Sequence, residues 1–439
     1  MDLRAYPTFR VAASDLNGQM RGKRVPSSYA EKLEDGAVRM PLSVLNVDLW
    51  GSDIRNSPLV FDSGDADGVL RPTSRGPVPM PWLSTPTPLV PMSMYTDTGA
   101  PFVGDPRHAL TDVLARYDAR GWKVVAATEM EFTLIDDNDS LPSAPTNPVT
   151  GRPINSSAIL SLRQLDAFDA YFTSLYAACA DMGIPADATI SESGLGQFEV
   201  NLAHQDAMRA ADDAWLFKSL VRGLARSQGF AATFMAKPYT QDAGNGMHLH
   251  FSVVDKAGHN IFDDGGPHGT NVLKQAVAGC LATLPASTLI FAPNGNSYDR
   301  LVPGAHAPVS AVWAYENRTA AIRIPGGPPA ARRIEHRVAG GDINPYLMLA
   351  TVLGAALTGI EDDMTPPAPV TGNAYDIADA PHVHRTWRAA IDAFEDDVLL
   401  QRILPPPLIR NLVMTKRQEM ERFAEIPAET HWLTYLEAV

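Results

Sequence analysis

After residue 104 the chain alternates between helix-like and strand-like patterns of apolar positions. Residues 105–121 have an acidic start, apolar positions three and four residues apart, and a final glycine, which predicts a helix. Residues 123–136 alternate in polarity as a strand does. Further helices are expected over about 164–182, 206–228, 270–285 and 344–361, separated by strand-like runs. This succession predicts an α+β sheet domain over 105–439.

The first 104 residues follow a different pattern. Residues 9–16 and 41–50 are short β-like runs, and a proline-rich tract follows over 71–92. Because proline has no backbone N–H to donate, this tract is not expected to form central strands or long helices. A small β-rich domain is therefore predicted over 1–104.

Composition narrows the classes of partner. The 439 residues are 45% apolar and carry a net charge of −14, spread along the chain, which argues against nucleic acid or an anionic membrane. No uncharged apolar run of about 18 residues suggests a membrane span, and the N-terminus does not resemble a signal peptide, so a cytoplasmic location is expected. Cys179 and Cys280 fall in helix-like segments and are expected to be buried thiols.

Acidic residues occupy alternate positions on the predicted strands. Side chains two apart share a face, so Glu129 and Glu131 point one way while Met130 and Phe132 point into the packing. A single pair of this kind is usually the solvated face of a sheet. The same spacing recurs at Glu192 and Glu199 across a glycine turn, at His248, His250 and Ser252, and at Arg333, Glu335 and Arg337. Carboxylates gathered on one face repel each other, so divalent cations are expected there.

Arginines flank a loop bounded by proline and glycine over 296–325. Arg300, Arg318 and Arg323 lie in this segment, and His306 is near its tip. Guanidinium groups bind carboxylates and phosphates through paired hydrogen bonds. The pattern suits a lid over an anionic substrate and a phosphoryl group; a solvated surface loop is the alternative.

In this order, the motifs resemble those of the glutamine synthetase superfamily. They lie at 129–131 (ExE), 192–199 (ExxPGQxE-like), 244–250 (GxGMHxH), 317–325 (NRxxxxRIP) and 333–337 (RxExR). Residues 15–26 and 99–107 also resemble family segments, so the resemblance covers nearly the whole chain. It implies a small β-grasp-like N-terminal domain, a glutamine-synthetase-type catalytic domain, and a homo-oligomer of stacked hexameric rings with shared active sites.

The resemblance also implies roles for the motif residues, with Mg²⁺ or Mn²⁺ and ATP as cofactors. The ligands of one metal would be Glu131, Glu192 and Glu199, and those of the second Glu129, His248 and Glu335. The nucleotide contacts would be Asp187, His204, His250, Ser252 and Arg333. The glutamate substrate would be bound by Arg300, Arg337 and Gly244, and the phosphoryl group by Arg318 and Arg323.

The implied reaction is ligation of the γ-carboxylate of glutamate to an amine through γ-glutamyl phosphate, with ATP consumed. His306 stands where ammonia-using members have a flap glutamate, and Ala243 where an asparagine holds glutamate. The segment whose aspartate binds ammonium in a neighbouring subunit's site is also altered, with Asp48 as our candidate and Asp53 as the second choice. These departures suggest an altered amine pocket. The γ-glutamylputrescine synthetase and γ-glutamylpolyamine ligase branch also lacks the flap glutamate, and this chain resembles it in the local runs over 15–26, 41–51, 232–239, 242–252, 317–325 and 337–347.

The acceptor predicted from this branch is putrescine, another polyamine or a primary monoamine. Three alternatives stay open on the sequence. They are an ammonia-using glutamine synthetase, a non-catalytic structural or regulatory homologue, and a metal-dependent hydrolase, which would have little use for so many arginines directed at phosphate.

Overall fold

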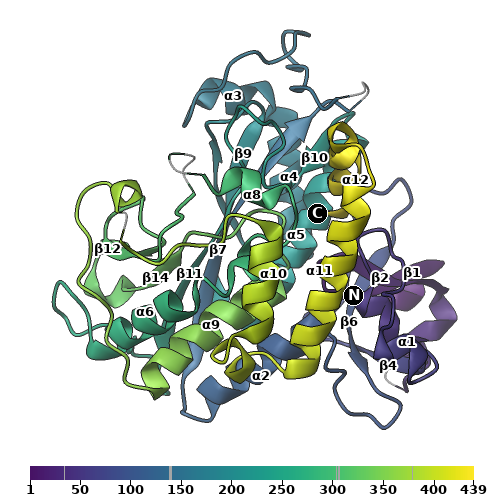
Figure 1. Cartoon of the computed structure of the whole chain (residues 1–439). Helices are drawn as coiled ribbons and strands as arrows, with labels where there is room; N and C mark the ends of the chain where they lie inside the picture. The colour runs from purple at the N-terminus through teal and green to yellow at the C-terminus, as the bar shows by residue number, and fades with distance from the viewer. Residues whose placement is uncertain (34, 138–140, 303, 305–306, 378) are drawn as a thin grey trace.

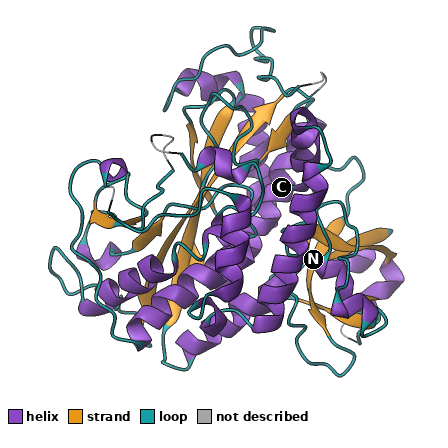
Figure 2. Ribbon diagram, in the orientation of Figure 1, coloured by secondary structure: helices purple, strands orange, loops and turns teal. Residues whose placement is uncertain are grey.

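The computed structural model describes residues 1–33, 35–137, 141–302, 304, 307–377 and 379–439. A small N-terminal sheet lies beside a much larger sheet covered by helices (Figures 1 and 2). The long helix α11 (Pro406–Ala424) lies between the helices of the large sheet and the N-terminal part of the chain (Figure 1). The α+β fold class predicted from the sequence is confirmed.

The N-terminal sheet has the strand order β2-β1-β6-β4-β3, with β5 paired to β6. Its strands are β1 (Thr8–Ser14), β2 (Met20–Pro26), β3 (Arg39–Pro41), β4 (Asp67–Pro72), β5 (Val78–Pro79) and β6 (Pro88–Tyr95). A short helix, α1 (Pro58–Phe61), follows β3. The sheet closes over its own apolar core, which includes Phe9, Leu70 and Met94.

The prediction that the proline-rich tract forms no central strand is wrong. Its end enters β6, which lies in the middle of the N-terminal sheet, parallel to β1 and antiparallel to β4. Proline lacks only the donor of a ladder bond. The carbonyl of Pro91 still accepts from the Thr73 N–H at 2.9 Å, and the non-proline residues of β6 supply the donors.

The β-like run over 41–50 is also not a strand. It forms a 3-10 helix over Leu42–Asn46 followed by a turn. The side chain of Asn46 donates to Gly104 O at 2.8 Å, and that of Asp48 accepts from the Trp50 and Ser52 amides. These side-chain bonds to the backbone take the place of a strand ladder.

The large sheet has the strand order β12-β13-β14-β11-β7-β9-β8, with β10 paired to β7. Its strands are β7 (Lys123–Ile135), β8 (Ala186–Ser191), β9 (Gln197–Asp206), β10 (Ala231–Thr233), β11 (Met247–Val254), β12 (Trp313–Tyr315), β13 (Ile322–Ile324) and β14 (Ile334–His336). The central strands β7 and β11 are antiparallel and pair over eight residues. Five of the six predicted metal ligands therefore belong to one continuous sheet, and the sixth, Glu192, directly follows the last residue of β8.

Helices pack on this sheet and on each other. They are α2 (Pro106–Asp118), α3 (Leu162–Ala167), α4 (Asp169–Met182), α5 (Ala207–Ser227), α6 (Asn271–Thr283), α7 (Thr288–Phe291), α8 (Ser297–Arg300), α9 (Pro345–Glu361), α10 (Trp387–Asp396), α11 and α12 (His431–Ala438). The helix predicted over 164–182 is divided at Phe168, whose backbone leaves the helical region. The first helix of the large part begins just after residue 104, and the division into domains 1–104 and 105–439 stays a prediction.

Both cysteines are buried and free, as expected, Cys179 in α4 and Cys280 in α6. In the part of the chain that the structure describes, no helix combines the length and the apolar character that crossing a membrane requires.

Candidate active site

The strand register brings the predicted metal ligands together. His248 on β11 lies opposite Glu129 on β7, and His250 lies opposite Glu335 on β14. On the other side of β7, Glu131 lies opposite Glu199 of β9. Met130 and Phe132, between the acidic positions, are fully buried, as the alternation predicted.

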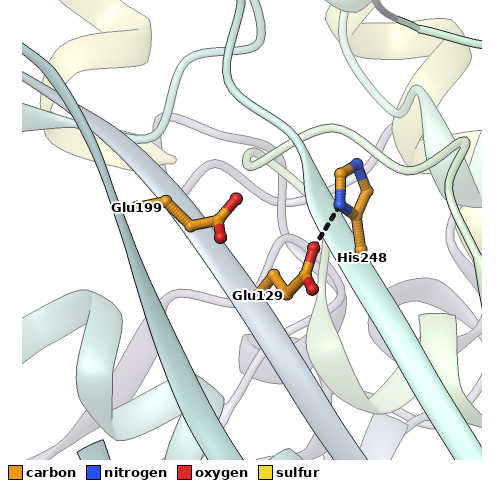
Figure 3. Close-up of side chains that lie close together, drawn as sticks. All are labelled: Glu129, Glu199 and His248. Atoms are coloured by element: carbon orange, nitrogen blue, oxygen red, sulfur yellow. Dashed lines mark hydrogen bonds and ion pairs between the residues drawn. The ribbon is translucent and has the colours of Figure 1, made fainter. Parts of the chain in front are cut away.

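Glu129 is the centre of this cluster. One carboxylate oxygen accepts from His248 Nδ1 at 2.7 Å and the other from His250 Nε2 at 2.8 Å. Although burial raises the pKa of Glu129, the bonds from the two histidines outweigh it and hold that pKa far below its usual range. Figure 3 shows Glu129, Glu199 and His248 pointing toward one another from three neighbouring strands.

Two groups of ligand atoms are close enough to hold a cation. Glu129, Glu199 and His248 form one, and Glu129, His250 and Glu335 the other, with the atoms of each group within 4.8 Å of one another. Carboxylate oxygens and imidazole nitrogens suit Mg²⁺ and Mn²⁺. His250, assigned to the nucleotide from the sequence, thus lies among the metal-ligand candidates, while Glu131 and Glu192 are not in either group of described residues.

The charges of the cluster explain why a cation fits it. Burial and the charges of Glu129 and Glu131 raise the pKa of Glu199 to about 10. Burial and the charge of Glu131 raise the pKa of Glu192 to about 7. These carboxylates repel one another inside the protein, and a divalent ion would relieve the repulsion.

Glu335 is surrounded by arginines. Its side chain is fully buried, and it accepts from Arg323 at 2.7 Å and also from Arg337. Burial raises the pKa of Glu335, but Arg337 and the neighbouring histidines hold it below its usual value. Both arginines, predicted to contact substrate or phosphoryl groups, therefore lie directly beside a metal-ligand candidate.

Glu131 is oriented by residues that were not singled out in the sequence. Its carboxylate accepts from the Gly246 amide at 2.6 Å and from Gln197 Nε2 at 3.3 Å. Gln197 is buried and also donates to Gly244 O at 2.9 Å and accepts from the Gly194 amide at 2.8 Å. The glutamine belongs to the ExxPGQxE-like segment, so its place in that motif was the available signal.

Arg300 is buried beside the glycines that precede β11. Its guanidinium donates to Val338 O at 2.8 Å. A Cβ on Gly244 would lie 2.2 Å from Ala236 O and 3.1 Å from Arg300 Cγ, and one on Gly246 would lie 2.6 Å from Arg300 Nη2. A side chain at Gly244 would collide with the Ala236 carbonyl, so glycine is required there, and Gly244 and Arg300 lie next to each other.

A cavity of about 570 Å³ opens beside the carboxylate cluster. The five predicted nucleotide contacts all line it: Asp187, His204, His250, Ser252 and Arg333. Arg333 donates to His250 Nδ1 at 3.2 Å, which connects the cavity to Glu129. Asn201, on β9, also lines the cavity and was not predicted, because an isolated asparagine on a strand carries no motif.

The remaining predicted residues that the structure describes are not among the metal-ligand candidates or the residues that line the cavity. Arg318 is exposed, its carbonyl accepts from Arg337 Nε at 3.2 Å, and its charge acts on Glu192. His306 lies outside the described residues. Asp48 is fully buried and accepts from Gln418 at 3.1 Å and Arg422 at 3.2 Å of its own chain, whereas Asp53 is exposed. Of these two candidates, Asp53 has the side chain that is open to a neighbouring molecule.

With this geometry in view, comparison with known proteins decides the family. A model of the catalytic domain of glutamine synthetase matches residues 103–435. The chain belongs to the glutamine synthetase family. The sequence prediction of a ligase of this family is confirmed.

Several relatives resemble this glutamine synthetase family member over nearly its full length. It is 35% identical to the gamma-glutamylputrescine synthetase PuuA of Escherichia coli (strain K12), over 98% of this chain and 92% of that protein. It is 31% identical to the glutamate–isopropylamine ligase of a Pseudomonas species, over 94% and 92%. The solved structure of apo GmaS without ligand superposes with a TM-score of 0.84 at 27% identity, over 98% and 96% of the two chains.

Proposed function

We propose that this protein ligates the γ-carboxylate of glutamate to an organic amine, with ATP hydrolysed to ADP and phosphate. The observation that carries the proposal is the carboxylate and histidine cluster, which is in contact with buried arginines and borders the 570 Å³ cavity. Such a site would bring a nucleotide phosphate and a carboxylate substrate to the same pair of cations.

The residues around the cluster would bind different parts of the substrates. Arg300 and Arg337 would pair with the carboxylates of glutamate, because a planar guanidinium matches a carboxylate. Arg318 and Arg323 would stabilise charge on the phosphoryl group as it moves to the γ-carboxylate. Bound to Glu129, Glu131, Glu192, Glu199, His248 and Glu335, Mg²⁺ or Mn²⁺ would neutralise charge on the phosphates and the acyl oxygen.

The acid must be activated before an amine can attack it. A carboxylate is a poor electrophile, so the γ-glutamyl phosphate is the proposed intermediate, and phosphate is its leaving group. The attacking amine must lose a proton, and His306 is the proposed acceptor. An aspartate from a neighbouring copy of the chain, Asp53 or Asp48, would complete the amine site, in the stacked rings predicted from the sequence.

An organic amine is favoured over ammonia by the relatives and by the flap. Two relatives that cover nearly the whole chain carry names of glutamate–amine ligases. The absence of the flap glutamate removes a carboxylate that would close the site around ammonium. An ammonia-using glutamine synthetase is the second candidate, because glutamine synthetases are also among the relatives, including one of Methanocaldococcus jannaschii at 33% identity.

A phosphate-release assay tests the proposal. ATP, Mg²⁺ and glutamate are held constant while ammonium, ethanolamine, short monoamines, putrescine, spermidine and spermine are compared. We expect release that requires both glutamate and an organic amine, with the γ-glutamyl amide identified by mass spectrometry. Glu335→Gln should abolish it, whereas Glu425→Gln, at the exposed end of α11, should not.

Two outcomes would contradict the proposal. Full activity with ammonium alone, unchanged by amines, would identify a glutamine synthetase. If calorimetry detected no metal-dependent nucleotide binding, the protein would be a non-catalytic member of the family.

A further inference from the structure

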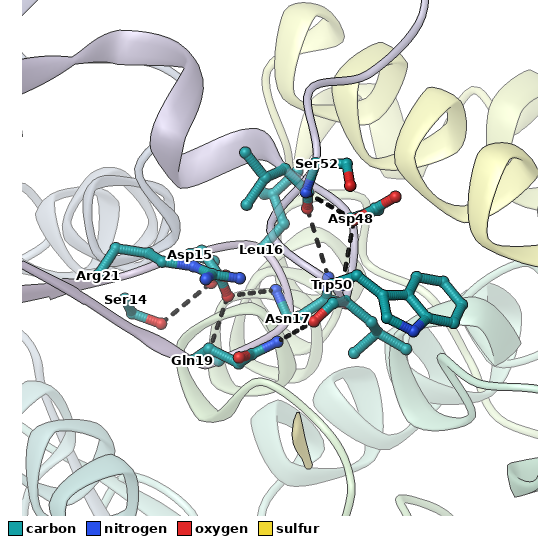
Figure 4. Close-up of polar contacts among 12 residues, drawn as sticks. Ser14, Asp15, Leu16, Asn17, Gln19, Arg21, Asp48, Trp50 and Ser52 are labelled. Carbon is teal, nitrogen blue, oxygen red and sulfur yellow. Dashed lines mark hydrogen bonds and ion pairs between the residues drawn. The ribbon is translucent and has the colours of Figure 1, made fainter. Parts of the chain in front are cut away.

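A buried polar network runs from the N-terminal part of the chain to the short helix that carries Arg300. We call it the Asn294 network. Its side chains are all at most 6% exposed, and its members are Asn17, Asn294, Ser297, Asp342, Lys416 and Glu419. Figure 4 shows its N-terminal end, where Asn17 lies next to the loop of Asp48 and Trp50.

The first half of the network joins the N-terminal part to helix α11. The side-chain amide of Asn17 donates to Glu419 at 2.8 Å. The Lys416 ammonium donates to Asn17 Oδ1 at 2.5 Å and to Glu419 at 2.8 Å. A third, longer bond of 3.4 Å runs from Lys416 to Asn294 Oδ1. The lysine therefore uses all three of its donors inside the protein.

The second half fixes the start of α8. Asn294 Nδ2 and Ser297 Oγ both donate to the same oxygen of Asp342, at 2.8 and 2.6 Å. The backbone N–H of Asn294 also donates to Ser297 Oγ at 3.0 Å. Ser297 is the first residue of α8 and Arg300 is its last, one turn further on. Because α8 is a single turn, the bond from Ser297 to Asp342 at its start fixes the position of the backbone from which the Arg300 side chain extends.

Two pairs of opposite charges lie along this path. Lys416 and Glu419 are in direct contact, and Asp342 is one of the carboxylates whose charge acts on Arg300. Burial lowers the pKa of Arg300, and Glu131 and Asp342 oppose that effect. The second oxygen of Asp342 has no hydrogen-bond partner among the described residues, and Arg300 and the buried Lys218 are two cations on which the charge of Asp342 acts. A buried charge without compensation is costly, so Asp342 and Arg300 stabilise each other.

We propose that Asp342, held by Asn294 and Ser297, is a positioning residue that keeps Arg300 aimed at the acid substrate. It acts through Arg300 without touching the substrate. Because Asn17 and Lys416 complete the network, docking of the N-terminal part onto α11 contributes to the affinity for glutamate. The inference rests on the proposed function, in which Arg300 binds a carboxylate of glutamate.

Asp342→Asn tests the charge of this residue while keeping its shape and an oxygen for Ser297. We expect the KM for glutamate to rise by about tenfold, since a charge-assisted contact is lost, with kcat and the KM for ATP nearly unchanged. Asp212→Asn is the matched control. Asp212 is equally buried and pairs with Arg107 at 2.9 Å, away from Arg300, so its variant should lose stability without a selective change in the KM for glutamate.

Two milder variants keep the test decisive if Asp342→Asn does not fold. Ser297→Ala and Asn17→Ala each remove two bonds of the network while leaving the Asp342 carboxylate in place, and we expect each to raise the KM for glutamate selectively, by about threefold. Equal rises in the KM for glutamate and ATP, or no rise in any folded variant, would overturn the positioning role. If the wild type shows no phosphate release that depends on glutamate, the proposed function fails. Calorimetric titration of the same variants with glutamate would then decide the positioning role.

Discussion

Replacing Glu199 by glutamine should stabilise the protein when no metal is present. Glu199 is only 6% exposed and lies on β9 among three other carboxylates. Its pKa rises from the usual 4.5 to about 10 in the folded protein. Below pH 4.5 both the folded and the unfolded chain hold the proton. Between pH 4.5 and 10 only the folded chain keeps it, so stability falls as pH rises.

The size of the effect follows from the width of that window. At pH 7 the protonation cost is about 3.5 kcal/mol, taking roughly 1.4 kcal/mol for each pH unit above 4.5. Glutamine does not titrate, so the variant avoids this cost. We expect the metal-free variant to unfold several degrees above the wild type at pH 8 and near it at pH 5. Mg²⁺ should then raise the wild-type midpoint more than the variant's, because the variant lacks one carboxylate ligand.

Thermal unfolding in the presence of a chelator, followed at pH 5, 7 and 8 and at one protein concentration, measures this. Glu425→Gln is the control, since its glutamate is exposed and distant in the chain from the cluster. A metal-free Glu199→Gln protein that is no more stable than the wild type at pH 8 would contradict this expectation. An advantage of equal size at pH 5 and pH 8 would also refute it.

Two further predictions concern the substrate subsites. Gly244→Ala should raise the KM for glutamate about tenfold and cost roughly 1–3 kcal/mol of stability, because its Cβ would press on Ala236 O and on Arg300. Gly266→Ala is the control, since a Cβ there meets only the side chain of Asp264. Equal KM values for the two variants would contradict this prediction. His306→Glu should raise the rate with ammonium relative to the rate with amines in the phosphate-release assay, because a carboxylate would attract ammonium; an unchanged ratio would exclude a selectivity role for His306.

The site was largely predictable from the sequence because its chemistry lies on regular strands. A strand places every second residue on one face, so the spacing of Glu129 and Glu131, and of His248 and His250, specifies which side chains lie together. Order along the chain then identified the family. The candidate metal ligands, arginines and nucleotide contacts were predicted in this way, and the five residues predicted to contact the nucleotide line one cavity.

The network around Asn294 could not be predicted in the same way. Asn17 and Glu419 are 402 positions apart and meet only because α11 packs beside the N-terminal part of the chain. The strand predicted over 41–50 is replaced by other structure partly for the same reason, since the side chain of Asn46 bonds to Gly104 and Asn411, which are far away in the chain. The bonds from the Trp50 and Ser52 amides to Asp48 are local and form a turn.

By itself, the sequence determined the fold class, the family and the strand residues of the site, because period-two spacing and motif order are local properties of the chain. The tertiary structure decided which carboxylates are close enough to share a cation, how Glu335 pairs with two arginines, and which contacts hold the helix that carries Arg300. Those properties depend on the strand register and on contacts between segments far apart in the chain, which are set only when the two sheets and helix α11 pack together.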